Sequence, residues 1–290
     1  MLSESLRSRL EALNRERLPE LQDSPRPSPP PRPALAKPRP APQPSAPGLL
    51  SGAKVCRNAA GEHLVMTVEI DQLWPGGGER VAGRIEHLVS LSGDAAGDGA
   101  TLTPGVEPLV GSLPDRAVLL DLETCGLAGA ALFLIGLLRQ VDGRLAVELL
   151  LARTYVEEQA VLVSLWQRLA NADAIGTFNG KSFDWPMVMD RSRRHLLHKR
   201  IEGGLVEPEH VDLLPIARRR WKPMLPDCKL QTIERMVCRR PRSGDIPGAQ
   251  IPAAYDEFVR SGRTDQMEKI LRHNALDLVT LLDVTLRVAA

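Results

Sequence analysis

Three apolar runs of strand length follow one another closely after Pro114, at residues 117–120, 132–138 and 146–151. Short polar connections separate them, which indicates strands that pair with their neighbours as a meander. A further strand is predicted at 174–177. Helical spacing of apolar residues recurs at 157–169, 183–197, 213–220, 229–237, 252–260 and 265–288. A meander followed by helices and another strand predicts an α/β domain rather than a helical bundle or a β-sandwich.

Two acidic residues, Asp121 and Glu123, end the first of these apolar runs. On a strand, residues i and i+2 point to the same face, so both carboxylates should project to one side. Like charges so close repel each other unless a cation lies between them, and hard divalent cations with oxygen ligands are the usual partner. A pair of solvated acids at a strand end is the alternative interpretation.

A third acid, Asp184, follows a turn-rich stretch that leaves the strand predicted at 174–177. Asn179 and Gly180 favour a tight turn, which places Asp184 at the start of the next helix. The helix dipole also favours an acid in the first helical turn, so the position alone does not establish a functional role.

The fourth acid, Asp277, lies four residues after His273 in the predicted C-terminal helix, so the two side chains share one helix face. Leucines flank Asp277, which therefore should lie near the core, where a carboxylate needs a partner or a metal ion. A solvated His-to-Asp pair is again the alternative.

In this order and context the motifs resemble those of the DEDD exonuclease superfamily, which includes polymerase proofreading domains and ribonuclease D-like enzymes. The residues that carry the resemblance are Asp121 and Glu123 for the first motif, Asn179, Phe183 and Asp184 for the second, and His273 with Asp277 for the third. The similarity is closer to the bacterial YprB-type predicted exonucleases, and it extends to residues 210–214, 245–248 and 273–274. It covers about residues 115–288 and implies a ribonuclease H-like fold, with a mixed central sheet flanked by helices.

The third motif departs from the superfamily pattern, in which a histidine stands five residues before the aspartate or a tyrosine stands four before it. His273 stands four before Asp277. Whether His273 acts as a base or orients the attacking water is therefore left open.

The resemblance implies a 3′-5′ exonuclease that hydrolyses phosphodiester bonds with two Mg²⁺ or Mn²⁺ ions. The implied metal ligands are Asp121, Glu123, Asp184 and Asp277, and His273 joins them as a catalytic residue. Thr124, Asn179 and Lys181 are candidates for binding the substrate, the 3′ end of single-stranded DNA or RNA. Two alternatives remain: a catalytically silent module that binds nucleic acid or protein, and an endonuclease of the ribonuclease H type.

The rest of the chain suggests appendages to this domain, which is predicted over residues 113–290. A short amphipathic helix is expected at 1–20, and a disordered Pro-rich linker at 21–50 is a possible site for a protein partner. Short β-like runs at 64–68 and 85–89, separated by glycine-rich turns, predict a small β-rich module over 51–112.

Charge and cysteine content exclude some other classes of protein. Lys+Arg 37 against Asp+Glu 36 leave a net charge of +1, so the chain is not a general polycation. The four scattered cysteines indicate neither a disulfide framework nor a zinc site. The longest apolar run, at 128–138, is much shorter than the roughly 20 residues of a membrane-spanning helix. We therefore expect a soluble, cytoplasmic protein with no membrane partner.

Overall fold

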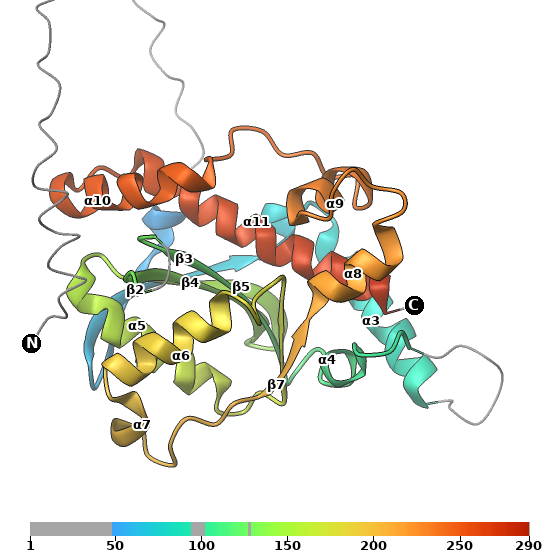
Figure 1. Cartoon of the computed structure of the whole chain (residues 1–290), viewed down its shortest axis with the longest axis horizontal. Helices are drawn as coiled ribbons and strands as arrows, with labels where there is room; N and C mark the ends of the chain where they lie inside the picture. Colours follow the sequence, from blue (N-terminus) through green and yellow to red (C-terminus); the bar gives the residue numbers. More distant parts are fainter. Residues whose placement is uncertain (1–47, 94–101, 127–128, 290) are drawn as a thin grey trace, which may run out of the picture. The chain divides into compact units, whose positions relative to one another are not determined.

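A seven-stranded mixed sheet lies at the centre of a computed structural model that describes residues 48–93, 102–126 and 129–289 (Figure 1). The strand order is β1-β2-β5-β4-β3-β6-β7. The strands are β1 (Lys54–Asn58), β2 (Gly61–Glu69), β3 (Ala117–Thr124), β4 (Leu132–Val141), β5 (Arg144–Leu151), β6 (Ala174–Thr177) and β7 (Glu209–Asp212). The helix expected at 1–20, and the linker up to residue 47, lie outside the described residues.

The central part of the sheet is the expected meander. β3 pairs antiparallel with β4, and β4 pairs antiparallel with β5. β6 then joins the other edge of β3 in parallel, and β7 continues in parallel beside β6. Because neighbouring parallel strands run in the same direction, β3 and β6 end on the same side of the sheet, and the segments that follow them start there.

Helices cover both faces of the sheet, so the middle strands are buried on both sides. α11 packs across β3, β4 and β5, whereas α5 packs against β1, β2, β4 and β5 (Figure 1). The helices are α2 (Ile70–Leu73), α3 (Gly77–Gly93), α4 (Glu107–Gly111), α5 (Glu158–Leu169), α6 (Asp184–Arg194), α7 (Leu197–Arg200), α8 (Leu213–Trp221), α9 (Leu230–Met236), α10 (Ile251–Ser261) and α11 (Asp265–Val288), with 3₁₀ turns η1 (Leu49–Gly52), η2 (Tyr155–Glu157) and η3 (Gly248–Gln250). The run without charged or polar side chains at 132–138 of β4 follows from this double burial, since that part of the strand has no solvated face to alternate with.

The separate β-rich module expected over residues 51–112 is wrong in two respects. β1 and β2 belong to the central sheet, because β2 pairs antiparallel with β5. The run at 85–89 lies in helix α3, not in a strand. The buried residues Val81, Ile85 and Leu88 of α3 recur at helical spacing. The run at 85–89 has only five residues, too few to show that spacing.

His63, on β2, gives the fold a measurable sensitivity to acid. The side chain is buried, and neither ring nitrogen has a hydrogen-bond partner. Burial lowers the pKa of His63 to about 4, helped by repulsion from Arg168 and Arg153 and opposed by Glu157. Folding therefore favours the neutral ring. This contribution to stability is complete above the ordinary pKa of 6.5 and is lost as the pH falls towards about 4.

We expect acidification from neutral pH to about pH 4 to lower the free energy of unfolding of the wild type by about 3 kcal/mol more than that of a His63→Leu variant. Urea denaturation of both proteins at the two pH values isolates this difference, because other titrating groups are common to both. A His198→Gln control, at an exposed histidine, should behave as the wild type. An equal loss of stability in His63→Leu and wild type would contradict the prediction.

Candidate active site

The end of β3 presents Asp121 and Glu123 to the face of the sheet that α11 covers. Both carboxylates line a cavity of about 440 Å³, together with His273 and Asp277 from α11. Residues more than 150 positions apart in the sequence therefore meet at this cavity, since Asn274 of α11 contacts Asp121 directly. The structure brings together three of the four acids that the sequence singled out.

The fourth acid, Asp184, opens α6 and lines a neighbouring cavity of about 650 Å³. Leu122, Thr124 and Gly126 line both cavities and so form a shared wall between them. Phe183, beside Asp184, is 63% exposed and lines the second cavity. Asp184 thus lies across this wall from the other acids, within electrostatic range of Asp121 and Glu123.

Burial and the charges of nearby acids make the carboxyl groups of Asp121, Glu123 and Asp184 hard to ionise. Burial, followed by the charges of Asp277, Glu123 and Asp184, raises the pKa of Asp121 well above its usual range. The pKa of Glu123 rises to about 8, chiefly through burial, although His273 opposes the shift. Burial also raises the pKa of Asp184 to about 7. If all of these acids were ionised, their negative charge would exceed the positive charge beside them, so a bound divalent cation would relieve the repulsion between them.

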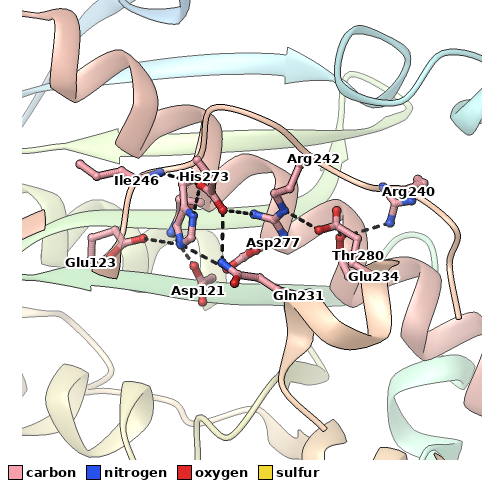
Figure 2. A network of polar contacts seen from close by, with 12 residues as sticks. Asp121, Glu123, Gln231, Glu234, Arg240, Arg242, Ile246, His273, Asp277 and Thr280 are labelled. Carbon is pink, nitrogen blue, oxygen red and sulfur yellow. Dashed lines mark hydrogen bonds and ion pairs between the residues drawn. The ribbon is translucent and has the colours of Figure 1, made fainter. Parts of the chain in front are cut away.

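His273 extends from α11 between the acids (Figure 2). Its Nε2 atom lies 3.5 Å from Asp277 Oδ2 and 4.0 Å from Glu123 Oε1. Its Nδ1 atom lies 2.6 Å from Asp245 Oδ1, on the far side of the ring. Burial lowers the pKa of His273, but the charges of Asp277, Glu123 and Asp245 outweigh it, so the net shift is upward.

Arg242 is a site residue that the sequence did not reveal. Its guanidinium donates hydrogen bonds to Asp277 and to Glu234 of α9, and Figure 2 shows it between these two carboxylates. Glu234 is buried and also accepts a hydrogen bond of 2.8 Å from Thr280 Oγ1. Arg242 thereby ties one oxygen of Asp277 to a buried acid, which holds Asp277 in a defined orientation.

Asn274 is a second residue without a predicted role. It is fully buried and donates from Nδ2 to Asp121 Oδ2 at 2.7 Å. Gly136, which pairs with Asp121 in the sheet, makes room for it, because a Cβ atom there would lie 1.8 Å from Asn274 Oδ1. A glycine inside an apolar strand is the sequence signal for such a close approach.

The turn before Asp184 is held by Asp212 at the end of β7. The Asp212 carboxylate accepts hydrogen bonds from the backbone amides of Asn179 and Lys181, at 2.8 and 3.2 Å. Asn179 has a φ of 68°, in the left-handed region that asparagine tolerates well. Asn179 and Lys181 line neither cavity, but Gly180 between them lies against Asp184, since a Cβ atom added there would be 2.8 Å from Asp184 Oδ2.

The donor chemistry of the site fits Mg²⁺ or Mn²⁺, since both prefer carboxylate oxygens. In the described part of the chain, no group of three or more His, Cys, Asp or Glu side chains is arranged so that it could hold one metal ion. The contacts explain this: His273 lies between Glu123 and Asp277, and Arg242 binds an oxygen of Asp277. Asp121, Glu123 and Asp277 line one cavity, and Asp184 lines the neighbouring one.

Comparison with known proteins gives three findings. A family model described as "RNase_H superfamily" matches residues 118–288. The uncharacterized protein YprB of Bacillus subtilis (strain 168) is 34% identical over 167 residues, which cover 57% of this chain and 40% of YprB. The chain thus spans less than half of that relative. Among solved structures, a family B DNA polymerase from the hyperthermophilic archaeon Pyrobaculum calidifontis aligns with a TM-score of 0.47 and 18% identity, over 58% of this chain and 24% of the polymerase.

Proposed function

The chain belongs to the RNase_H superfamily, and on that premise we propose that it is a metal-dependent 3′-5′ exonuclease. The ribonuclease H-like fold expected from the sequence is confirmed. The observation that most supports the proposal is the cavity lined by Asp121, Glu123 and Asp277, which come from two elements far apart in the sequence. Buried acids whose charges repel one another destabilise a fold, so a pocket built from them indicates a function that needs them.

Asp121, Glu123, Asp184 and Asp277 are the residues that would hold the divalent ions. Two ions bound by such acids supply an activated water and offset charge on the leaving 3′ oxygen. His273 accepts or steers the proton of the attacking water through Nε2, the nitrogen that faces the cavity acids. Arg242 and Asn274 hold Asp277 and Asp121 in orientation.

The cavity on the Asp184 side suits the end of a nucleic acid strand. Its lining is mainly apolar, with Leu122, Phe183 and Met187 beside the polar groups of Thr124 and Asp184. An exposed aromatic ring is a surface on which any base can stack, whatever its identity. Together, the two cavities would place a terminal base against Phe183 and the adjoining phosphate near the shared wall.

The direction of cutting belongs to this proposal and rests on the resemblance of the three acidic motifs, and the proposal covers single-stranded DNA and RNA alike. Asn179 and Lys181, on the exposed turn, are proposed to contact the strand beyond its terminal nucleotide. Within the described residues, no helix combines the length and apolar character needed to cross a bilayer. The cytoplasmic location stays a prediction.

The test is an assay of the purified protein on 5′-labelled single-stranded DNA and RNA, with Mg²⁺, Mn²⁺ or EDTA. We expect a ladder of products that shorten from the 3′ end with either metal and no products with EDTA. Internal cuts before any shortening would show an endonuclease instead. Binding of the labelled strand without cleavage under every metal condition would support the silent module and contradict the proposed function.

A further inference from the structure

We infer that Asp245 is a positioning residue, which holds the His273 ring with Nδ1 as hydrogen-bond donor and Nε2 free towards the acidic cavity. The inference rests on the proposed nuclease function and adds a residue to it. Asp245 belongs to the loop between α9 and η3, which carries no acid of the three motifs. Its Oδ1 atom lies 2.6 Å from His273 Nδ1.

Asp245 is itself held firmly, so it can hold His273. Its Oδ1 also accepts the backbone amide of Ile246 at 3.0 Å, and Ile246 is buried and anchors the loop. Its Oδ2 accepts from Gln231 Nε2 at 3.2 Å and pairs with Arg242 Nη1 at 3.5 Å. Figure 2 shows Ile246 on one side of His273 and Arg242 and Gln231 on the other. Both oxygens are therefore engaged before any substrate arrives.

Because both of its oxygens are occupied by contacts with the protein, Asp245 has a different role from the acids that line the cavity. Asp245 does not line the cavity shared by Asp121, Glu123 and Asp277, whereas His273 does. The carboxylate thus reaches the site through the His273 ring, which it contacts directly, and through Arg242, which also binds Asp277. A carboxylate bonded to one imidazole nitrogen fixes which tautomer is present and where the other nitrogen points.

This arrangement answers the question that the motif spacing left open. With Nδ1 occupied by Asp245, the lone pair of the neutral ring is on Nε2, which points between Glu123 and Asp277. A water held by those acids then lies beside a basic nitrogen, so the ring can accept its proton. Histidine at the tyrosine spacing is a working proton acceptor in this chain because the α9–η3 loop provides the orienting carboxylate.

Asp245→Asn is the sharpest variant, because it keeps the shape of the side chain and reverses one hydrogen bond. At the Oδ2 position the amide NH₂ would face two donors, Gln231 Nε2 and Arg242 Nη1, whereas at the Oδ1 position it faces one, the backbone N–H of Ile246. It is therefore turned towards His273 Nδ1 and donates to it. The proton of the neutral ring then moves to Nε2, which can no longer accept one from water.

We expect Asp245→Asn to lower kcat for cleavage about 100-fold, the range typical of lost proton transfer, with KM and Mn²⁺ affinity changed less than about threefold. The KM and metal readouts distinguish positioning from a general collapse of the site. Asp173→Asn is the matched control. It replaces an exposed acid at the opposite end of β6 and should leave kcat unchanged.

A second measurement does not depend on activity. ¹⁵N spectra of protein labelled at histidine, taken at alkaline pH where the ring is neutral, report which nitrogen of His273 carries the proton; a His273→Gln variant assigns the signals. We expect protonated Nδ1 in the wild type and protonated Nε2 in Asp245→Asn.

The outcomes separate this inference from the proposed function. Protonated Nε2 in an active wild type, or an Asp245→Asn variant with unchanged kcat, would overturn the role of Asp245 alone. A wild type that cuts no nucleic acid with either metal would overturn the nuclease function, and with it the catalytic role of Asp245, even if Nδ1 carried the proton. A parallel fall in kcat and Mn²⁺ affinity would assign Asp245 to the metal site and overturn the inference as well.

Discussion

Asp121→Asn is expected to lower the rate of metal-dependent cleavage by about 1000-fold or more, equivalent to about 4 kcal/mol of activation free energy. Burial and the charges of Asp277, Glu123 and Asp184 all oppose the ionisation of Asp121. It is also the acid that Asn274 orients. Asparagine keeps the size and one acceptor oxygen of the side chain but removes the charge that a divalent ion requires. Single-turnover cleavage of a labelled oligonucleotide measures the loss.

A stability measurement tells loss of metal binding from misfolding. In EDTA, Asp121→Asn should melt at or above the wild-type temperature, because a buried and repelled carboxylate has been neutralised. Addition of Mn²⁺ should raise the melting temperature of the wild type and not that of the variant, since a ligand that binds only the folded state stabilises it. Substantial activity in the variant, or equal stabilisation of both proteins by Mn²⁺, would contradict the assignment of Asp121.

Gly136→Ala should destabilise the protein by about 4 kcal/mol, the sum of about 3 kcal/mol for overpacking and about 1 kcal/mol for a disturbed buried hydrogen bond. The added Cβ would lie 1.8 Å from Asn274 Oδ1 and 2.8 Å from Leu278 Cδ1. Both side chains are buried, so neither can swing aside into solvent. Asn274 must shift away from Asp121, and cleavage should fall together with stability. Urea denaturation gives the change in unfolding free energy.

Gly83→Ala is the matched control for that substitution. Gly83 lies inside α3, and a Cβ added there meets no atom within 4 Å. Alanine is the better helix former, so this variant should be equal to the wild type or up to about 1 kcal/mol more stable. If Gly136→Ala were as stable as Gly83→Ala, the close packing of Asn274 on β4 would not be the constraint described here.

Two of the three acidic motifs were readable from the sequence because they depend on local periodicity. Asp121 and Glu123 share a face through the two-residue repeat of a strand, and His273 and Asp277 share a face through the turn of a helix. The meander was equally accessible, since each apolar run ends at a short connection. These features require no knowledge of distant contacts, and the sheet pairing and the shared cavity agree with them.

The supporting residues were not accessible in the same way. Arg242 lies in a loop with no repeating pattern, and its contact with Asp277 is revealed only by the folded chain. Asp245 falls in the segment 245–248 that the resemblance includes, but its contact with His273 likewise depends on the fold. The membership of β2 in the central sheet likewise depends on pairing with β5, about 80 residues later. Two local signals did exist for Asn274: an amide in the buried stripe of a long helix, and a lone glycine in an apolar strand.

The position of α11 makes the completion of the candidate site depend on the packing of this helix. His273, Asn274 and Asp277 all lie in this final helix, and it must cross β3 and β4 before any of them reaches Asp121. A growing or cleaved polypeptide without α11 has two acids at the end of a strand and no partner for them. The proposed hydrolysis therefore requires α11 to be docked on the sheet, so the same helix that covers β3 and β4 also completes the site.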